Sequence, residues 1–129
     1  DAVRARETAL TDTVPLRWAG MLVSEQTRQF AAWRDIPGRF LPPVFGAFRM
    51  GLEERLPLTL LNDWDLDTNG PLSQCRVLIL PGASALSDSQ CDAIRAFVRA
   101  GGGLVATGES SLCDAIGRPR PDFALTDLF

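Results

Sequence analysis

Most of the residues whose side chains could do chemistry lie in four short polar stretches, each directly after an expected strand. These stretches are residues 24–28, 62–65, 82–84 and 108–111. Because the carboxyl ends of parallel strands meet at one edge of a sheet, we expect the four stretches to border one crevice. A small ligand bound there would have seven candidate contacts: Arg28, Asp63, Gly82, Ser84, Gly108, Glu109 and Ser110.

The best placed of these for catalysis is Ser110, which follows a strand where a nucleophile elbow would lie. An elbow of the form G-x-S-x-G needs a second glycine, and this chain has Leu112 at that position. A serine or cysteine nucleophile also needs a base, and the chain contains no histidine. Glu109 is more typical of a helix start than of a base, and we expect Cys113 to be packed. The sequence therefore predicts no catalytic residue.

The composition excludes further classes of chemistry. The absence of His removes the commonest metal ligand, and the absence of Lys excludes Schiff-base and P-loop chemistry. Cys75, Cys91 and Cys113 are odd in number and form no CxxC motif, so we expect buried free thiols in a reducing cytoplasm, with no zinc. The net charge of −3 comes from interspersed charges and argues against nucleic-acid or membrane partners. No cofactor is indicated.

Three other patterns have a functional interpretation that we weigh against a plain one. Residues 65–70 match the first half of a calcium loop, but Arg76 stands where the bidentate glutamate belongs. Residues 101–103 are three glycines at a helix C-terminus, where the dipole repels phosphate, so they are expected to end the helix. Five aromatic residues could form a sugar platform, but we expect most to be core, with Trp33 or Trp64 at an interface: Trp18, Phe30, Trp33, Phe40 and Trp64.

The elements that must position these residues centre on residues 76–111. Residues 77–80 form an unbroken apolar run, typical of a strand covered on both faces. Ser87 and Gln90 predict a capping box, with Leu86 and Cys91 as a hydrophobic staple. A helix up to residue 100 and a second buried strand at 104–107 complete a right-handed βαβ crossover.

Further strands are expected at residues 16–23 and 58–61. Between them, Pro42 and Pro43 open a helix whose apolar face would be Val44, Phe45, Phe48 and Leu52. A short helix should follow residue 111 and end at Gly117, and Asp122 could cap a last turn over 123–128. We therefore predict a flavodoxin-like, three-layer α/β fold with at least four parallel strands in the order 2-1-3-4 and helices on both faces.

A chain of 129 residues fits one domain, which we place at residues 13–129. Residues 1–12 are expected to be a helical connector from an upstream domain, because the chain begins without Met in helix-like sequence. No signal peptide and no apolar stretch of about 20 residues is present, so we expect a cytoplasmic fragment of a larger protein.

Taken together, residues 77–82, 86–88 and 101–105 resemble the trimerisation domain behind the catalytic barrel of family forty-two β-galactosidases. The likeness covers most of the chain from Leu16 on. It implies a fold similar to class I glutamine amidotransferases without their catalytic residues, since the G-x-C-x-G cysteine and the downstream histidine are missing here. In that family the domain mediates trimer contacts and does not cleave sugar.

Three functions stay open. The first is a non-catalytic assembly domain of a larger glycoside-hydrolase-like protein, which self-associates as a dimer or trimer and contacts the parent's catalytic barrel. The second is a small-ligand or carbohydrate-binding module that uses the carboxyl edge of the sheet. The third is an amidotransferase-like enzyme, for which the nucleophile and base are missing.

Overall fold

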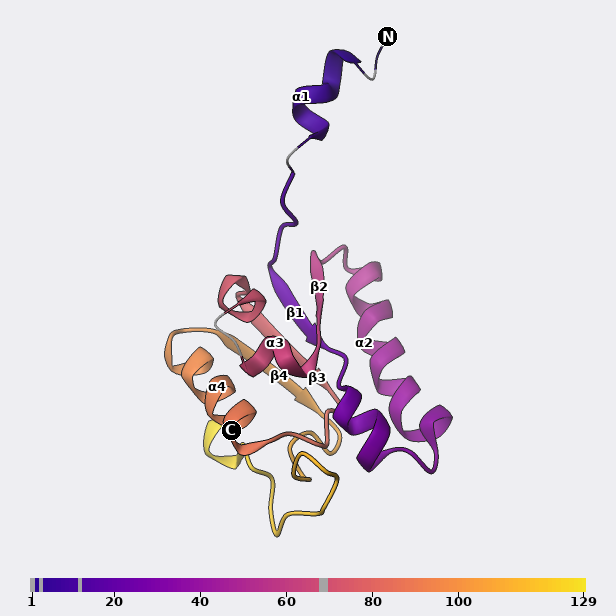
Figure 1. Cartoon of the computed structure of the whole chain (residues 1–129), viewed down its shortest axis with the longest axis vertical. Coiled ribbons are helices and arrows are strands. Elements are labelled where there is room, and N and C mark those ends of the chain that lie inside the picture. The colour runs from indigo at the N-terminus through magenta and orange to yellow at the C-terminus, as the bar shows by residue number, and fades with distance from the viewer. Residues whose placement is uncertain (1, 3, 12, 68–69) are drawn as a thin grey trace.

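The chain folds around a sheet of four parallel strands in the order β2-β1-β3-β4. The computed structural model describes residues 2, 4–11, 13–67 and 70–129. The strands are β1 (Ala19–Leu22), β2 (Leu58–Leu61), β3 (Val77–Pro81) and β4 (Gly103–Thr107). Figure 1 shows their carboxyl ends meeting at one edge. The predicted fold class and strand order are confirmed.

Helices cover both faces of the sheet, which gives three layers. On one face, α2 (Leu41–Glu53) packs Val44 against Ala19, Met21 and Ile79. On the other, α3 (Asp63–Asp67) and α4 (Asp88–Arg99) enclose the larger core. Its fully buried side chains include Leu22, Leu61, Leu66, Leu78, Leu80, Leu86, Cys91 and Ile94. Strands buried on both faces are typical of parallel sheets and explain the apolar runs in the sequence.

The βαβ crossover has the local structure that its sequence predicts. Ser87 Oγ accepts a hydrogen bond from Gln90 N, and Gln90 Oε1 accepts one from Ser87 N, so the capping box is complete. Leu86 and Cys91 belong to the same buried core cluster, as a staple requires. The helix ends where Gly101 adopts φ +96°, a conformation that glycine enters without a steric cost.

Two of the predicted strands differ from the expectation. β1 starts at Ala19 instead of residue 16, because pairing with β2 and β3 begins only there. Leu16 is 75% exposed and lies outside the sheet. β4 is an edge strand and not the buried strand that its apolar residues suggest. Among the described residues it pairs with β3 alone, and Val105 is 48% exposed.

The predicted apolar face of α2 is partly wrong. Val44, Ala47 and Gly51 face the sheet, and a Cβ on Gly51 would meet the side chain of Leu58. Phe45 and Leu52 are 60% and 62% exposed. Because α2 carries apolar residues around most of its circumference, periodicity alone does not show which stripe the sheet buries.

Residues 108–120 form turns instead of the predicted short helix. Cys113 makes isolated parallel and antiparallel bridges to Ala85 and Pro119, which hold this segment across the end of the sheet. Gly117 does not stop a helix but adopts φ +78° beside the backbone of Phe30. Near the end of the chain, Asp122 accepts a hydrogen bond from Phe123 N, and the expected last turn covers only Thr126–Leu128.

Helical structure also appears in segments for which the sequence predicts no helix. The stretch after β1 enters a π-helical turn at Thr27–Ala31, and a second one spans Ile36–Phe40. α3 begins directly after β2, within the predicted loop. At the N-terminus, a 3₁₀ turn at Arg4–Arg6 and α1 (Glu7–Leu10) stand away from the sheet (Figure 1). Within the described residues, no helix is long and apolar enough to cross a membrane.

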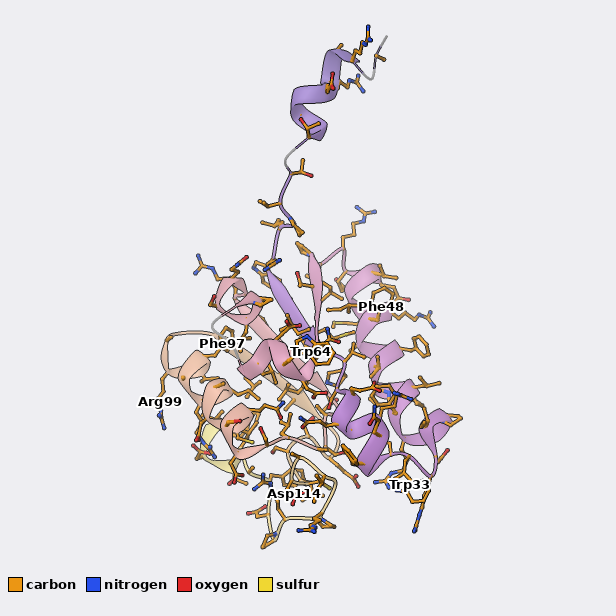
Figure 2. The ribbon with its side chains drawn as sticks, viewed as in Figure 1. Trp33, Phe48, Trp64, Phe97, Arg99 and Asp114 are labelled. Atoms are coloured by element: carbon orange, nitrogen blue, oxygen red, sulfur yellow. The ribbon has the colours of Figure 1, made fainter. Side chains whose placement is uncertain are left out.

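The aromatic residues are less buried than predicted. Phe40 lies in the core, but Trp18 and Phe30 are 41% and 45% exposed, contrary to the expectation. Trp33 and Trp64 are both more than half exposed, and Figure 2 labels them on different parts of the molecule. That Trp33 or Trp64 lies at an interface stays a prediction.

Candidate functional site

A crevice of about 230 Å³ opens at the carboxyl edge of the sheet, between the segments that follow β1, β3 and β4. The chain leaves β1 toward β2 on one side and returns to β3 on the other, so this is the switch point where such folds bind ligands. The lining residues are Thr27, Ala31, Ala32, Arg39, Pro43, Gly82, Ser84, Thr107, Gly108 and Glu109. We call this hollow the switch-point crevice.

Four of the seven predicted ligand contacts line this crevice, namely Gly82, Ser84, Gly108 and Glu109. Gly82 and Gly108 lie against each other: a Cβ built on Gly108 would be 3.8 Å from the Gly82 Cα. Both glycines line the crevice without a side chain, and a Cβ on Gly82 would meet the Pro43 ring at 3.0 Å.

The polar groups of the crevice come from distant parts of the chain. Arg39 Nη2 donates a hydrogen bond of 2.8 Å to Glu109 Oε2, and both side chains are about half exposed. Ser84 is 4% exposed, and its N–H and C=O are satisfied by Gly82 and Cys113. Its hydroxyl has no protein partner within the part of the chain that the structure describes.

Asp63 does not line the crevice. It joins the segment after β2, to which it belongs, to the segment after β1. Its carboxylate accepts hydrogen bonds from Ser24 Oγ at 2.8 Å and from Gln26 N at 3.0 Å. Gln90 Nε2 on α4 donates to the Asp63 carbonyl oxygen. The side chain is 4% exposed, so all of this takes place in the protein interior. The geometry gives Asp63 a structural role.

Ser110 is likewise occupied by the fold. Its Oγ lies 2.9 Å from the carbonyl oxygen of Leu80 and 2.8 Å from that of Thr107, and it accepts from Ala83 N. Ser110 is 6% exposed. These contacts tie the end of β4 to the end of β3, and the hydroxyl points into them instead of into the crevice.

Arg28 lies at the surface and outside the crevice lining. Its Nε donates to Glu25 Oε2 at 2.8 Å, and its Nη2 contacts the other carboxylate oxygen. Hydrogen bonds from Arg28 and then from Gln29 lower the pKa of Glu25 from its ordinary 4.5 to about 2. Arg28 is thus engaged in an ion pair on its own helical turn.

The lowered pKa of Glu25 predicts a change in acid stability. Because the folded-state pKa lies below the unfolded value, the ion pair contributes stability above the unfolded pKa and loses it as the pH falls toward about 2. Between about pH 5 and about pH 2.5, urea unfolding of Glu25→Gln should therefore lose less stability than the wild type does. Asp114 and Asp127 also have lowered pKa values and are common to both proteins. If the wild type and Glu25→Gln lost the same stability over this pH range, the lowered pKa of Glu25 would be contradicted.

Four further lining residues are not among the seven contacts predicted from the sequence: Thr27, Arg39, Pro43 and Thr107. Thr107 ends a strand and Thr27 follows one. Both could therefore have been predicted from the same position at the carboxyl end of a strand that identified their neighbours. Arg39 and Pro43 had no such signal, since Pro43 lies in the first turn of α2 and Arg39 lies on the π-helical turn at Ile36–Phe40, and neither directly follows a strand. The Asp35 side chain accepts from Gly38 N and caps that turn.

None of the three thiols is suited to nucleophilic chemistry. Cys75, Cys91 and Cys113 are buried and free, as predicted. Burial raises the pKa of each thiol, so the thiolate fraction at neutral pH is small.

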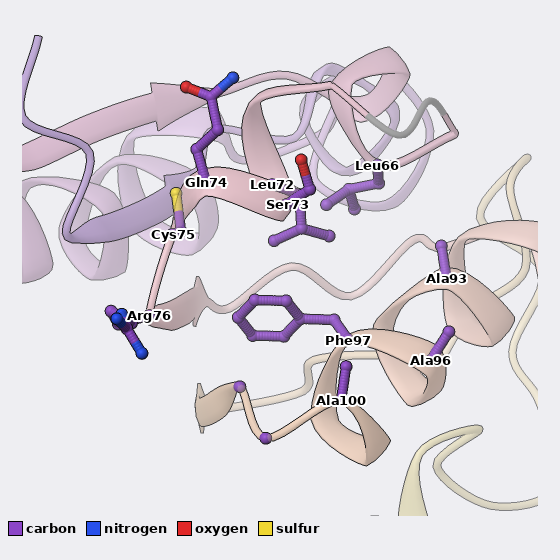
Figure 3. A pocket seen from close by; sticks show the side chains of 12 residues that line it. Leu66, Leu72, Ser73, Gln74, Cys75, Arg76, Ala93, Ala96, Phe97 and Ala100 are labelled. Atoms are coloured by element: carbon purple, nitrogen blue, oxygen red, sulfur yellow. The ribbon is translucent and has the colours of Figure 1, made fainter.

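A larger hollow of about 580 Å³ lies at the opposite, amino end of the strands (Figure 3). Figure 3 shows the Phe97 ring extending into it from α4, beside Ala93, Ala96 and Ala100. A third hollow, near the C-terminus, is lined mostly by small and apolar residues such as Ala106, Phe123 and Leu125. Neither has a cluster of polar side chains that points to a reaction.

Within the calcium-loop motif at residues 65–70, residues 68–69 and the side chain of residue 67 lie outside the described part. Among the residues that are described, no group of three or more Asp, Glu or Cys side chains could hold a metal ion.

Several solved structures share this fold. A β-galactosidase from Bifidobacterium adolescentis aligns with a TM-score of 0.69 and 20% identity over 85% of this chain. A catalytic mutant of a GH42 β-galactosidase from G. stearothermophilus gives 0.71 and 18% over 91%. α-L-Fucosidase isoenzyme 2 from Paenibacillus thiaminolyticus gives 0.61 and 28% over 87%. The matched part is 51% of the first of these chains, 17% of the second and 16% of the third.

No protein-family model and no curated protein matches the chain. The structural similarity therefore shows the fold, and it shows that the same fold occurs as a part of longer glycosidase chains.

Proposed function

We propose that this chain is a non-catalytic assembly domain of a larger glycoside-hydrolase-like protein, and that it self-associates. The matched glycosidase chains support the parent class, since the fold occupies about half or less of each of them. In the parent, we expect the domain to lie beside a catalytic barrel that carries the hydrolytic residues.

The hollows of this chain support the non-catalytic part. Most glycosidases use two carboxyl groups that flank the bond to be cleaved, at a separation of about 5–10 Å. Glu109 is the single carboxylate among the residues that line the three hollows described above. A lone carboxylate paired with Arg39 supplies neither the acid nor the nucleophile of such a pair.

The observation that carries the assembly role is an exposed apolar surface along one edge of the sheet. Phe45, Phe48 and Leu52 follow one another at helical spacing on α2, and their exposed fractions are 60%, 37% and 62%. Leu60 on the edge strand β2 is 54% exposed and points to the α2 side, as Leu58 does. We call these four residues the α2–β2 edge. Large apolar side chains exposed on neighbouring elements are typical of protein interfaces.

Substitutions at the α2–β2 edge test the proposal. The double variant Phe45→Glu, Leu52→Glu places two carboxylates on this edge, and its association constant should fall at least about tenfold. Both side chains are solvent-exposed, so the fold should be retained, and circular dichroism checks this. Light scattering coupled to size exclusion over a range of concentrations measures the mass.

Val105→Glu is the matched control, because Val105 is an exposed apolar residue on the opposite edge strand, β4. It should associate as the wild type does. A wild type that stays monomeric at every concentration, or a loss of association in the control alone, would contradict an interface at the α2–β2 edge.

A further inference from the structure

The switch-point crevice contains polar groups that the protein itself leaves without a complete set of partners. Ser84 is 4% exposed, and its hydroxyl has no protein partner within the described residues. It is not among the buried side-chain atoms that lack a partner, so its oxygen is accessible from the crevice that Ser84 lines. Thr27, 2% exposed, accepts from Ala85 N at 3.0 Å and still has its own hydroxyl proton to donate. The hydroxyls of two lining residues, Ser84 and Thr27, can thus each make a further hydrogen bond to a bound molecule.

The charges beside these hydroxyls restrict what that molecule can be. Arg39 and Glu109 form an ion pair, and it is the one pair of opposite charges among the lining residues. Because Glu109 already compensates the charge of Arg39, neither an anion nor a cation would meet an uncompensated opposite charge in this crevice. A neutral ligand can use the remaining guanidinium donors and carboxylate lone pairs without separating the pair.

Adjacent hydroxyl groups fit such a pair. The guanidinium can donate to the oxygen of one hydroxyl while the carboxylate accepts the proton of the next. Ser84 and Thr27 would supply further hydrogen bonds, and Gly82 and Gly108 line the crevice without side chains.

The volume sets the size of the ligand. Drug-sized ligands occupy pockets of about 300–1,000 Å³, whereas this crevice holds about 230 Å³. We propose that the switch-point crevice binds a small neutral polyhydroxy compound, no larger than one sugar ring, through Arg39, Glu109 and Ser84. No aromatic side chain lines the crevice to stack on a ring, so the dissociation constant should be on the order of 1 mM.

Titration of the ¹⁵N-labelled chain with D-glucose, D-galactose and glycerol tests this, each up to about 50 mM, which is well above that dissociation constant. The amide resonances of Gly82, Ser84 and Gly108 should shift with saturation for at least one of the three. Ser84→Ala removes an unpaired hydroxyl and should fold as well as the wild type, yet bind at least about fivefold more weakly. Arg49→Ala, which breaks the exposed Arg49–Glu53 pair on α2, is the matched control and should bind normally.

Sodium acetate and ammonium chloride are the charged competitors at the same concentrations. If none of the three polyols shifts these resonances, or if acetate or ammonium binds more tightly than the polyols, the proposal is overturned. Equal binding by Ser84→Ala and the wild type would also overturn it. None of these outcomes depends on whether the chain self-associates through the α2–β2 edge.

Discussion

Replacing Asp63 with alanine is expected to lower the free energy of unfolding by about 3 kcal/mol, because it leaves one buried and one partly buried donor without an acceptor. Ser24 Oγ and Gln26 N both donate to this carboxylate, and Ser24 Oγ in turn accepts from Thr27 N. The loss would release the segment after β1 from β2. Urea unfolding followed by circular dichroism measures the change.

Asp65→Ala is the matched control, since it removes one carboxylate two residues away. Within the described part of the chain, Asp65 Oδ2 accepts one bond, from Asn62 N, and the residue is only partly buried. We expect a loss of about 1 kcal/mol there. If Asp63→Ala were no more destabilising than Asp65→Ala, the buried carboxylate would not be the link between β1 and β2, and a role in ligand binding would become the better interpretation.

The second large effect is expected at Gly117. A Cβ at this position would lie 2.6 Å from the carbonyl oxygen of Phe30 and 2.7 Å from its carbonyl carbon. Both are backbone atoms, which cannot rotate away, and the φ of +78° is unfavourable for any other L-residue. Gly117→Ala should therefore destabilise the protein by about 3 kcal/mol.

Gly46→Ala provides the opposite control within the same chain. Gly46 lies inside α2, and its Cβ would meet nothing within 4 Å. Alanine is favoured there by about 0.5–1 kcal/mol, so this variant should be stabilised. In thermal unfolding, the midpoint temperature of Gly117→Ala should fall below that of the wild type and the midpoint of Gly46→Ala should rise above it. A tolerated Gly117→Ala would mean that residues 108–120 are not held against the turn at Phe30.

The sequence determined the elements whose signal is local. The capping box of α4 needs only Ser87 and Gln90, and its end needs only Gly101, so helix and boundaries could be predicted. β2 and β3 were found from short apolar runs bounded by turns, and alternation of strand and helix then required a parallel sheet. The strand order followed from the same pattern.

The sequence also gave part of the candidate site. Gly82, Ser84, Gly108 and Glu109 follow strands, and a parallel sheet must bring such residues together. The sequence could not distinguish these four residues from Ser110. Ser110 also follows a strand, but its hydroxyl bonds to the buried carbonyl oxygen of Leu80 and does not face the crevice. Whether a polar side chain faces a crevice or a buried carbonyl depends on the neighbouring segment, and no local pattern records that.

Only the tertiary structure decided which apolar residues are core and which are surface. Val44 and Phe45 are adjacent on α2, yet the sheet buries Val44 and leaves Phe45 60% exposed. Val105 sits in as apolar a strand as Ile79 does, but β4 has a neighbour on one side only. Burial depends on which elements lie next to each other in space. The edge that we propose for assembly and the Arg39–Glu109 pair therefore appear only when segments far apart in the chain have packed together.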